Sequence, residues 1–554
     1  MRGTPGDAAE RQEKAAGAAP AGRRLLGRGR SGEVWLSEDP AEGWIATKIF
    51  YGDTLSNLVH YVLTGAPNPY IWNEDAVRCA YERRKILHAL VPFWLGGRLE
   101  VADATHVRWN EAARAWELGT RFVPGAPVPL LHPFRPEDGR LEWLLREVMH
   151  PLQERLEESG FLGAVWQAGR GNPVALNNYL LLPDERFVFI DAESGVPALF
   201  PMNPLALLGF YLPQSLRLGR ALFDDVDTER LCRYLEAEAP ALERALGAAA
   251  LETLRRRAGR LAHHQRRWKG LRRAERGILY QLAKGRLTPA QAEHYRRHPL
   301  RWRLREARRA AVKAARRAAA LPGAAARLFA RLDLPGRLRQ LRRFVASQEY
   351  RTEIGRGYVE GRIARWEERG QITGAEAARL RADLARTEES SSYITDFGAH
   401  LGLKASFLTV ELLLLGILAL LGVPLVILAL IVLLDGPIYR SLYTAWRALQ
   451  AARARQPLPW VAFLVGLVPE FGSMAFPAQM VWSARGERDD VARFILCDSF
   501  TRLGNKLPIW GGADTLVEHR LNRLGMAMAG ASERWRRRRA ARHGPAAPRP
   551  GDGA

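Results

Sequence analysis

The sequence contains little cysteine, and the few cysteines it has suit neither a metal site nor a disulfide framework. The three residues, Cys79, Cys232 and Cys497, are scattered along the chain and match no metal-ligand spacing. Disulfide scaffolds are instead typical of short, cysteine-dense secreted domains. We therefore expect reduced thiols and a cytoplasmic compartment.

Acidic residues are also scarce relative to basic ones. The chain has 59 Asp and Glu against 82 Lys and Arg, which gives a formal net charge of +23 over 554 residues. This length predicts several domains, and a hydrophobic content of 47% is ample for their cores. A charge of this sign and size favours a nucleic acid or an anionic membrane surface as a partner.

Both ends of the chain lack the patterns of folded structure. Residues 1–22 are rich in Ala, Gly and charge, without the apolar stretch of a signal peptide, so we expect a disordered arm. Residues 534–554 begin with an arginine cluster and continue with prolines, so we expect a disordered basic tail.

A glycine-rich stretch near the start carries the first functional signal. Gly27, Gly29 and Gly32 follow a G-x-G-x-x-G spacing, Val34 comes two residues later, and Lys48 comes 14 residues after that valine. The flanking residues predict strands on either side of a turn, and the apolar, β-branched run 44–50 predicts a core strand. A Rossmann fingerprint fits less well, because it requires a helix after the third glycine.

This combination resembles the beginning of the protein kinase fold. There a glycine-rich hairpin covers the nucleotide phosphates and a lysine of the third strand reaches them. The resemblance implies ATP as the ligand of these glycines, the valine and Lys48. The alternative is an ordinary glycine-rich hairpin beside an exposed lysine.

Two further kinase elements are implied less strongly. The stretch from Glu74 to Leu90 predicts a helix, and the resemblance implies that one of its glutamates pairs with Lys48, with Glu82 preferred over Glu74. Either glutamate could equally be a solvated helix residue. Residues 116–125 resemble the fifth strand and hinge, which implies that the backbone around residues 121–123 contacts adenine.

The second functional signal lies near residue 180. Asn178 is followed by a short strand, a turn at residues 183–186, a buried strand, and then Asp191, 13 residues after the asparagine. Kinases place their two magnesium-binding residues in this order and at this spacing, with Asp191-Ala-Glu-Ser-Gly195 in the position of Asp-Phe-Gly. The resemblance therefore implies that Asn178 and Asp191 bind Mg²⁺, which prefers such hard oxygen ligands.

The catalytic base of kinases has no counterpart here. Kinases carry His-Arg-Asp five residues before the asparagine, but Gly171, Asn172 and Pro173 occupy these positions. Asn172 cannot act as a base. Of the nearest acidic residues (Glu158, Asp184, Glu185 and Glu193), only Glu193 stands beside a proposed metal ligand. The domain could have an atypical catalytic loop, bind nucleotide without phosphoryl transfer, or catalyse another transfer from ATP.

The rest of the chain divides by composition. We expect a kinase-like N-lobe over residues 23–125 and a helical lobe over 126–247. Residues 248–404 are rich in Ala, Arg and Leu and predict basic helices, suited to an anionic bilayer surface or simply solvated. Within them, Thr288 with Gln291 and Thr373 with Glu376 predict the capping boxes of two similar helix hairpins.

The C-terminal part, residues 405–533, contains two apolar segments, at about 407–434 and 459–482. The first holds 23 residues without a charge, from Leu412 to Leu434, which is long enough to span a membrane. The second is interrupted by Glu470 and by two prolines. Each segment could cross once or turn back as a re-entrant hairpin; two crossings are slightly favoured. Glu470 is expected at a functional or packing site, or as the cap of a broken helix.

Together these features predict an α+β protein: a two-lobed protein kinase-like domain, an α-helical basic region and a C-terminal helical membrane region. The predicted function is phosphoryl transfer that requires ATP and Mg²⁺, to a membrane-proximal acceptor such as an envelope lipid or glycolipid. The alternative is a nucleotide-binding pseudokinase scaffold. We expect location at a cell inner membrane with the kinase-like domain in the cytoplasm, and anionic lipids rather than nucleic acid as partners.

Overall fold

The computed structural model has an α+β fold and divides into two compact units. The first comprises Met1–Val128 and Gly139–Lys313, and the second Pro129–Asp138 and Ala314–Ala554. The structure describes residues 23–128, 139–193, 207–217 and 223–312 with gaps at 30, 53, 173–174 and 310; then 342–368 (gap at 345), 372–390, 394–402 (gap at 400), 441–453 (gap at 450–451), 460–467, 475–483 and 490–506; and single residues at 336, 339, 458, 523, 527, 530, 531, 534 and 538.

A five-stranded antiparallel sheet forms the N-terminal part of the first unit. The strands lie in the order β1-β2-β3-β6-β5, and their bounds are Arg24–Arg28, Gly32–Asp39, Gly43–Phe50, Ala115–Arg121 and Ala104–Asn110. In β3, Ile45 and Thr47 are buried on one face. The two-residue period places Lys48 on the opposite face. The strands predicted around the glycine-rich stretch are thus confirmed.

Helix α3, Glu74–Leu95, connects this sheet to the remainder of the unit. Asn73 begins the helix by accepting a hydrogen bond from the Ala76 amide at 2.8 Å, and Gly96, in the left-handed conformation, ends it. The predicted helix is confirmed and extends five residues further. The segment before it also contains a helix, α2 at Thr54–Thr64, and the short η1 at Pro69–Ile71, which were not predicted.

A second sheet of four short strands lies in the order β4-β9-β8-β7. Their bounds are Leu99–Val101, Phe187–Phe189, Tyr179–Leu181 and Ala126–Pro127. Strands β8 and β9 form the predicted antiparallel hairpin, and β4 pairs in parallel with β9. Strand β9 is one of the two inner strands of this sheet, and all three of its residues are buried.

Short helices complete this half of the unit. The predicted helix near residues 142–158 is present as one continuous stretch with a π-helical turn in its middle. The elements are α4 Arg140–Trp143, η2 Leu144–Met149, α5 His150–Glu158, α6 Ala164–Gln167, η3 Ala175–Asn178, η4 Leu207–Tyr211, α8 Leu212–Arg217, α9 Thr228–Ala237 and α10 Ala239–Leu246.

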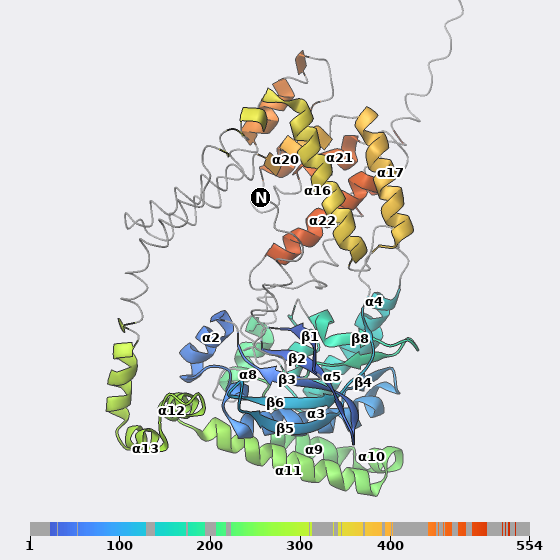
Figure 1. Cartoon of the computed structure of the whole chain (residues 1–554). Coiled ribbons are helices and arrows are strands. Elements are labelled where there is room, and N and C mark those ends of the chain that lie inside the picture. Colours follow the sequence, from blue (N-terminus) through green and yellow to red (C-terminus); the bar gives the residue numbers. More distant parts are fainter. Residues whose placement is uncertain are drawn as a thin grey trace, which may run out of the picture. The chain divides into compact units, whose positions relative to one another are not determined.

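The first basic helix, α11 at Ala248–Gly270, belongs to the first unit, so the boundary expected after residue 247 does not divide the fold. Its buried residues Leu251, Leu254, Ala258 and Leu261 recur at helical spacing and make an apolar stripe. Helix α11 packs along α3 (Figure 1). Composition suggested a separate region because the other faces of α11 are strongly basic.

Two shorter helices follow, α12 at Arg273–Ala283 and α13 at Pro289–Arg297. Gly285, with a φ of 65°, turns the chain between them, and Thr288 with Gln291 forms the predicted capping box. In the second unit Thr373 and Glu376 also exchange hydrogen bonds, at 2.7 and 3.3 Å, at the start of α17. Both predicted capping boxes are confirmed.

The second unit is helical where the structure describes it. Its core brings together α16 Gln348–Glu368, α17 Gly374–Ser390, α20 Trp460–Gly466, α21 Ala475–Ser483 and α22 Asp490–Lys506. Asp498 is buried and accepts hydrogen bonds from Arg362 at 2.7 Å and from the Trp366 indole at 3.0 Å. This polar contact joins α16 to α22.

The two ends of the second apolar segment lie side by side, whereas the favoured single crossing would hold them apart. The rings of Trp460 and Trp482 lie 4.9 Å apart, whereas a straight helix would separate these residues by about 33 Å. Gln479 of α21 also accepts bonds from the Val461 and Ala462 amides, both at 3.1 Å. The chain therefore turns back on itself, which is the hairpin alternative.

No helix within the described residues is both long enough and apolar enough to span a membrane. The first apolar segment, with the uncharged run 412–434, and Glu470 of the second segment lie outside the described residues.

The contact between α3 and α11 gives a first test. Glu82 is buried and accepts hydrogen bonds from Arg257 at 2.9 Å and Arg260 at 2.7 Å. We expect Glu82→Gln to lower the free energy of unfolding by about 1–3 kcal/mol, because charge-assisted bonds to a buried group are lost. Urea unfolding measures this. Glu74→Gln, which removes an exposed pair on the same helix, is the control, and equal effects of the two would contradict the account.

Candidate functional site

The glycine-rich stretch forms a tight hairpin between β1 and β2. The Gly29 amide donates to the Gly32 carbonyl at 2.8 Å. A Cβ atom at Gly32 would lie 2.6 Å from the Ile49 carbonyl oxygen of β3, so only glycine fits there. A Cβ atom at Gly27 would meet nothing within 4 Å, and one at Gly29 would lie 3.8 Å from the Gly32 carbonyl oxygen; none of the three glycines has a positive φ. Val34 pairs with Lys48 across the sheet.

Lys48 and Asp191 come together, although 143 residues separate them in the sequence. The lysine Nζ donates to Asp191 Oδ1 at 2.7 Å and to the Glu193 carbonyl at 3.1 Å. The lysine side chain is largely buried, and that of the aspartate is about one third exposed. The strand and the segment after β9 therefore meet at a partly open ion pair beside the glycine hairpin.

Asn178 lies at the same end of the β8–β9 hairpin as Asp191. Its carbonyl accepts the Ile190 amide at 2.8 Å. Its side-chain nitrogen donates to Gln167 Oε1 at 3.1 Å and to the Gln167 carbonyl at 2.9 Å, which directs the amide oxygen away from that residue. An amide oxygen and a carboxylate are donors that fit Mg²⁺. The described residues contain no group of three or more His, Cys, Asp or Glu arranged to hold a metal ion.

Glu82 does not pair with Lys48, so the expected ion pair is wrong. It faces α11, and the residue of α3 that reaches the site is Arg84. The two residues lie about 200° apart around the helix, because each residue turns it by about 100°. The site-facing position is therefore an arginine. Its spacing from buried Ala80 and Leu87 was the only sign of this in the sequence.

Arg84 makes a two-pronged ion pair with Glu193. Its Nε and Nη2 donate to the two carboxylate oxygens at 2.8 and 2.6 Å, and the same guanidinium donates to the Ala102 and Ile190 carbonyls. Both side chains are almost fully buried. Burial acts to raise the pKa of Glu193, but the charges of Arg84, Lys48 and Arg83 outweigh it and hold the pKa below its usual value.

In this arrangement Glu193 is an anion that holds Arg84, and its candidate role as a catalytic group stays a prediction. A carboxylate that stays ionised in a double hydrogen bond is a poor proton acceptor. Asp184 and Glu185 lie in the turn at the opposite end of the hairpin from Asp191. Glu158, at the end of α5, pairs with Arg155. None of these four carboxylates takes the position of the missing base.

Asn172 lies in a turn before η3 and is buried, with its amide bonded to the Gly169 carbonyl at 3.3 Å. Gly169 and Gly171 both have positive φ, which explains the glycines of this turn. Pro173 lies outside the described residues.

The proposed hinge offers fewer backbone donors than expected. The Arg121 amide donates to the Asp103 carbonyl and the Phe122 amide to the Trp44 carbonyl, both at 2.9 Å. These two donors are therefore used within the unit. Adenine contacts through them would require a different arrangement.

Sequence reasoning also missed a buried polar network behind α3. The Tyr70 hydroxyl donates to Asp224 at 2.7 Å and accepts from Arg83 at 2.9 Å. Arg83 also donates to the Asp224 carbonyl at 3.0 Å. Burial raises the pKa of Asp224 despite the nearby arginine. The network holds α3 from the side next to Arg84, and its members come from distant parts of the chain.

Comparison with known proteins gives no match: neither a family model nor a curated protein is similar to this chain. The functional argument therefore depends on the geometry described above.

The ion pair of Arg84 and Glu193 predicts a pH-dependent stability. Glu193→Gln should cost about 3–5 kcal/mol at pH 7, because it leaves a buried guanidinium without its charge partner. Since the folded pKa is lowered, this stability is complete above the unfolded value near 4.5 and is lost as the pH falls through the folded pKa. The difference in the free energy of unfolding between wild type and Glu193→Gln should thus become smaller at acidic pH.

Urea unfolding of both proteins between pH 3 and 7 measures that difference. Glu157→Gln is the control. Glu157 pairs with Arg170 and is more exposed than Glu193, so this substitution should lower the free energy of unfolding by less than about 1 kcal/mol. A difference that stays constant with pH, or one no larger than the control's, would refute the proposed role of Glu193.

Proposed function

We propose that the first unit is a kinase-like domain that binds ATP with Mg²⁺ and transfers the γ-phosphoryl group to a membrane-proximal acceptor. The observation that carries the proposal is the 2.7 Å contact of Lys48 with Asp191 beside the glycine hairpin. A hairpin, a lysine on the third strand and an aspartate after a two-stranded hairpin are the parts that a kinase-like site requires, in the required chain order.

The residues of the site suit the charge of a nucleotide. Phosphate oxygens would compete with Asp191 for Lys48, and the backbone of the Gly29–Gly32 turn can approach them closely because it carries no side chain at its glycines. Asp191, released from the lysine, and the Asn178 amide oxygen would then supply ligands for Mg²⁺. The metal would neutralise phosphate charge during the transfer.

The transfer itself needs little from the protein beyond positioning. The bond between the γ-phosphorus and the β–γ bridging oxygen breaks, a bond from the acceptor oxygen forms, ADP leaves, and the acceptor proton passes to water. Phosphoryl transfer depends mainly on alignment and charge stabilisation. A general base typically contributes about 10²- to 10⁴-fold, so a site without one is slow but competent.

A second function, nucleotide binding without transfer, is favoured by the role of Glu193. Its carboxylate is held by Arg84, and Pro173, beside Asn172, stands where a kinase has its base. In this reading the first unit is a pseudokinase that senses ATP and acts through binding. Both functions share the nucleotide site and differ only in turnover.

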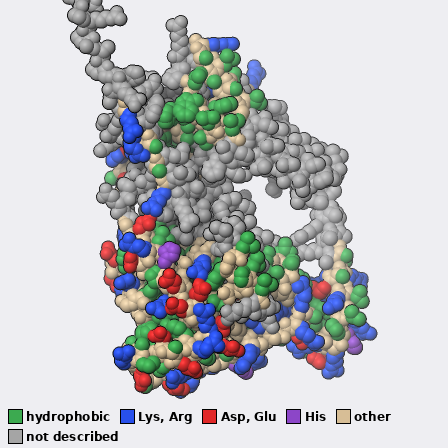
Figure 2. Space-filling model, turned by 180° about the vertical axis from the view of Figure 1, so that it is seen from behind, with side chains coloured by type: hydrophobic (Ala, Val, Ile, Leu, Met, Phe, Trp, Pro, Cys, Tyr) green, Lys and Arg blue, Asp and Glu red, His purple; other side chains and the backbone are tan. Residues whose placement is uncertain are grey.

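The membrane location in the proposal rests on sequence and surface. The run 412–434 has the length and hydropathy of a spanning segment, and the net charge of +23 favours an anionic bilayer. On α20, Trp460, Phe463 and Leu464 are exposed. Figure 2 shows hydrophobic side chains gathered on the second unit. An exposed apolar patch of this kind suits contact with lipid. We place the protein at an inner membrane with the first unit in the cytoplasm.

Nucleotide affinity tests the site. We expect Lys48→Ala and Asp191→Ala each to weaken Mg-ATP binding by about 10- to 100-fold, because each removes a charged partner of the nucleotide or its metal. Lys85→Ala is the matched control: Lys85 makes an equally short ion pair with Asp103 on the same unit and should bind ATP as the wild type does. Calorimetric titration of the purified full chain measures the affinities.

Turnover then separates the two functions. If the wild type releases ADP and Asp191→Ala does not, phosphoryl transfer is supported. If the wild type binds Mg-ATP tightly but releases no ADP, the pseudokinase is supported. If wild type and Lys48→Ala bind ATP equally, or neither binds it, both functions are refuted.

A further inference from the structure

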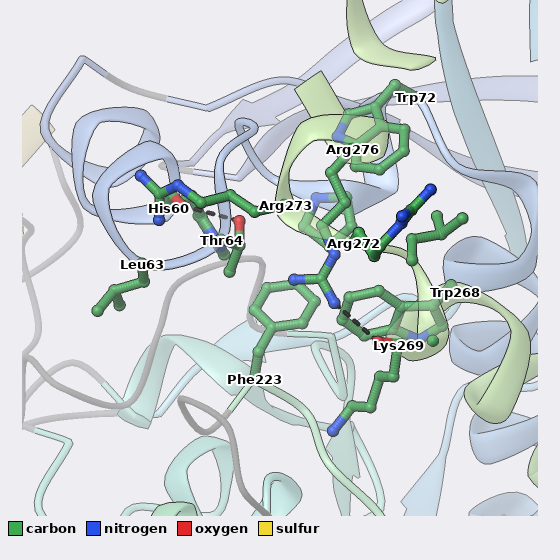
Figure 3. Close-up of a pocket in the computed structure, with 13 residues that line it drawn as sticks. His60, Leu63, Thr64, Trp72, Phe223, Trp268, Lys269, Arg272, Arg273 and Arg276 are labelled. Carbon is green, nitrogen blue, oxygen red and sulfur yellow. Dashed lines mark hydrogen bonds between the residues drawn. The ribbon is translucent and has the colours of Figure 1, made fainter. Parts of the chain in front are cut away.

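The first unit contains a cavity of about 400 Å³ away from the candidate nucleotide site. It lies between the end of α2, the start of η1, Phe223 and the junction of α11 with α12 (Figure 3). Its volume is in the range of small-molecule binding sites. Lys48, Asn178 and Asp191 are not among the residues that line it.

The lining is rich in positive charge. It contains Lys269, Arg272, Arg273 and Arg276, and no Asp or Glu among the described residues that line the cavity. Arg276 is nine-tenths buried, and Figure 3 shows its side chain extending between Phe223 and Trp268. Its guanidinium lies 5.6 Å from the centre of the Trp268 ring and donates to the Lys269 carbonyl at 3.0 Å.

Nearby carboxylates offset only part of this charge. Asp225 pairs with Lys269, and Glu275 accepts from the backbone and side chain of Arg272. Arg273 donates instead to the Val62 and Tyr61 carbonyls, at 2.7 and 3.1 Å. Carbonyl oxygens carry no net charge, so the cavity retains an excess of positive charge.

Aromatic rings form the rest of the wall. Trp72, Phe223 and Trp268 line the cavity, and the rings of the last two meet edge to face at 6.0 Å. Leu63, partly exposed, adds an apolar group to the lining. Rings and leucine exclude water and so strengthen charge interactions inside, and they offer a surface for an apolar or planar group.

We propose that this cavity binds a phosphate monoester whose phosphate contacts the arginines and whose apolar or planar body lies against the aromatic wall. Arginine forks match phosphate oxygens geometrically, and a partly buried cation attracts an anion more strongly than an exposed one. Such a ligand is either a soluble phosphate ester or the head group of an anionic lipid. The proposal is independent of the candidate nucleotide site.

Two probes distinguish these sources in calorimetric titrations of the full chain: phenyl phosphate, and dihexanoyl phosphatidic acid below its micelle concentration. We expect saturable binding of at least one, and the tighter probe identifies the source. Arg276→Gln should weaken that binding at least tenfold. Arg297→Gln, an exposed arginine of α13 paired with Glu293, is the matched control and should not change it.

Two further variants test the proposal in case Arg276→Gln does not fold. Arg273→Gln should also weaken binding, and it replaces Arg276→Gln if thermal unfolding shows that the latter is not folded. Phe223→Leu should weaken phenyl phosphate more than inorganic phosphate. The proposal is overturned if neither probe binds saturably, if folded Arg276→Gln or Arg273→Gln binds as the wild type does, or if Lys48→Ala abolishes the binding.

Discussion

The buried ion pair of Arg84 with Glu193 is the constraint on which the candidate site depends. It fixes helix α3 to the segment after β9, and this segment carries Asp191 two residues before the glutamate. A pair of this kind contributes little net stability, because desolvation of both charges offsets their attraction. The pair instead fixes the position of the segment. Arg84 also donates to the carbonyls of Ala102 and Ile190, so Asp191 is held where Lys48 reaches it.

The two glutamates considered for the site, Glu82 and Glu193, have contacts that differ from those expected from the sequence. Glu82, expected in the site, joins α3 to α11, while Glu193, considered as a catalytic group, anchors the segment that carries Asp191 to α3. Lys48 consequently bonds directly to Asp191 without an intervening helix glutamate. In this form Lys48 and Asp191 neutralise each other. Binding of Mg-ATP would have to replace this ion pair by a contact of Lys48 with phosphate and of Asp191 with the metal.

The parts of the structure that the sequence predicted are those encoded locally. The glycine hairpin, the β8–β9 hairpin and both capping boxes follow from residues within a few positions of one another. What it did not predict needs contacts between distant residues: Arg84 with Glu193, α11 along α3, and Trp460 with Trp482. Composition suggested a boundary after residue 247 because α11 carries many arginines beside the apolar residues through which it packs.

Labelling of the full chain by an acyl-phosphate derivative of ATP, followed by peptide mass spectrometry, tests the central claim most directly. The reagent transfers its acyl group to a lysine amine beside the bound phosphates. The account predicts that Lys48 is acylated and that excess Mg-ATP suppresses this labelling. Acylation of surface lysines alone, with Lys48 unmodified or indifferent to Mg-ATP, would contradict it.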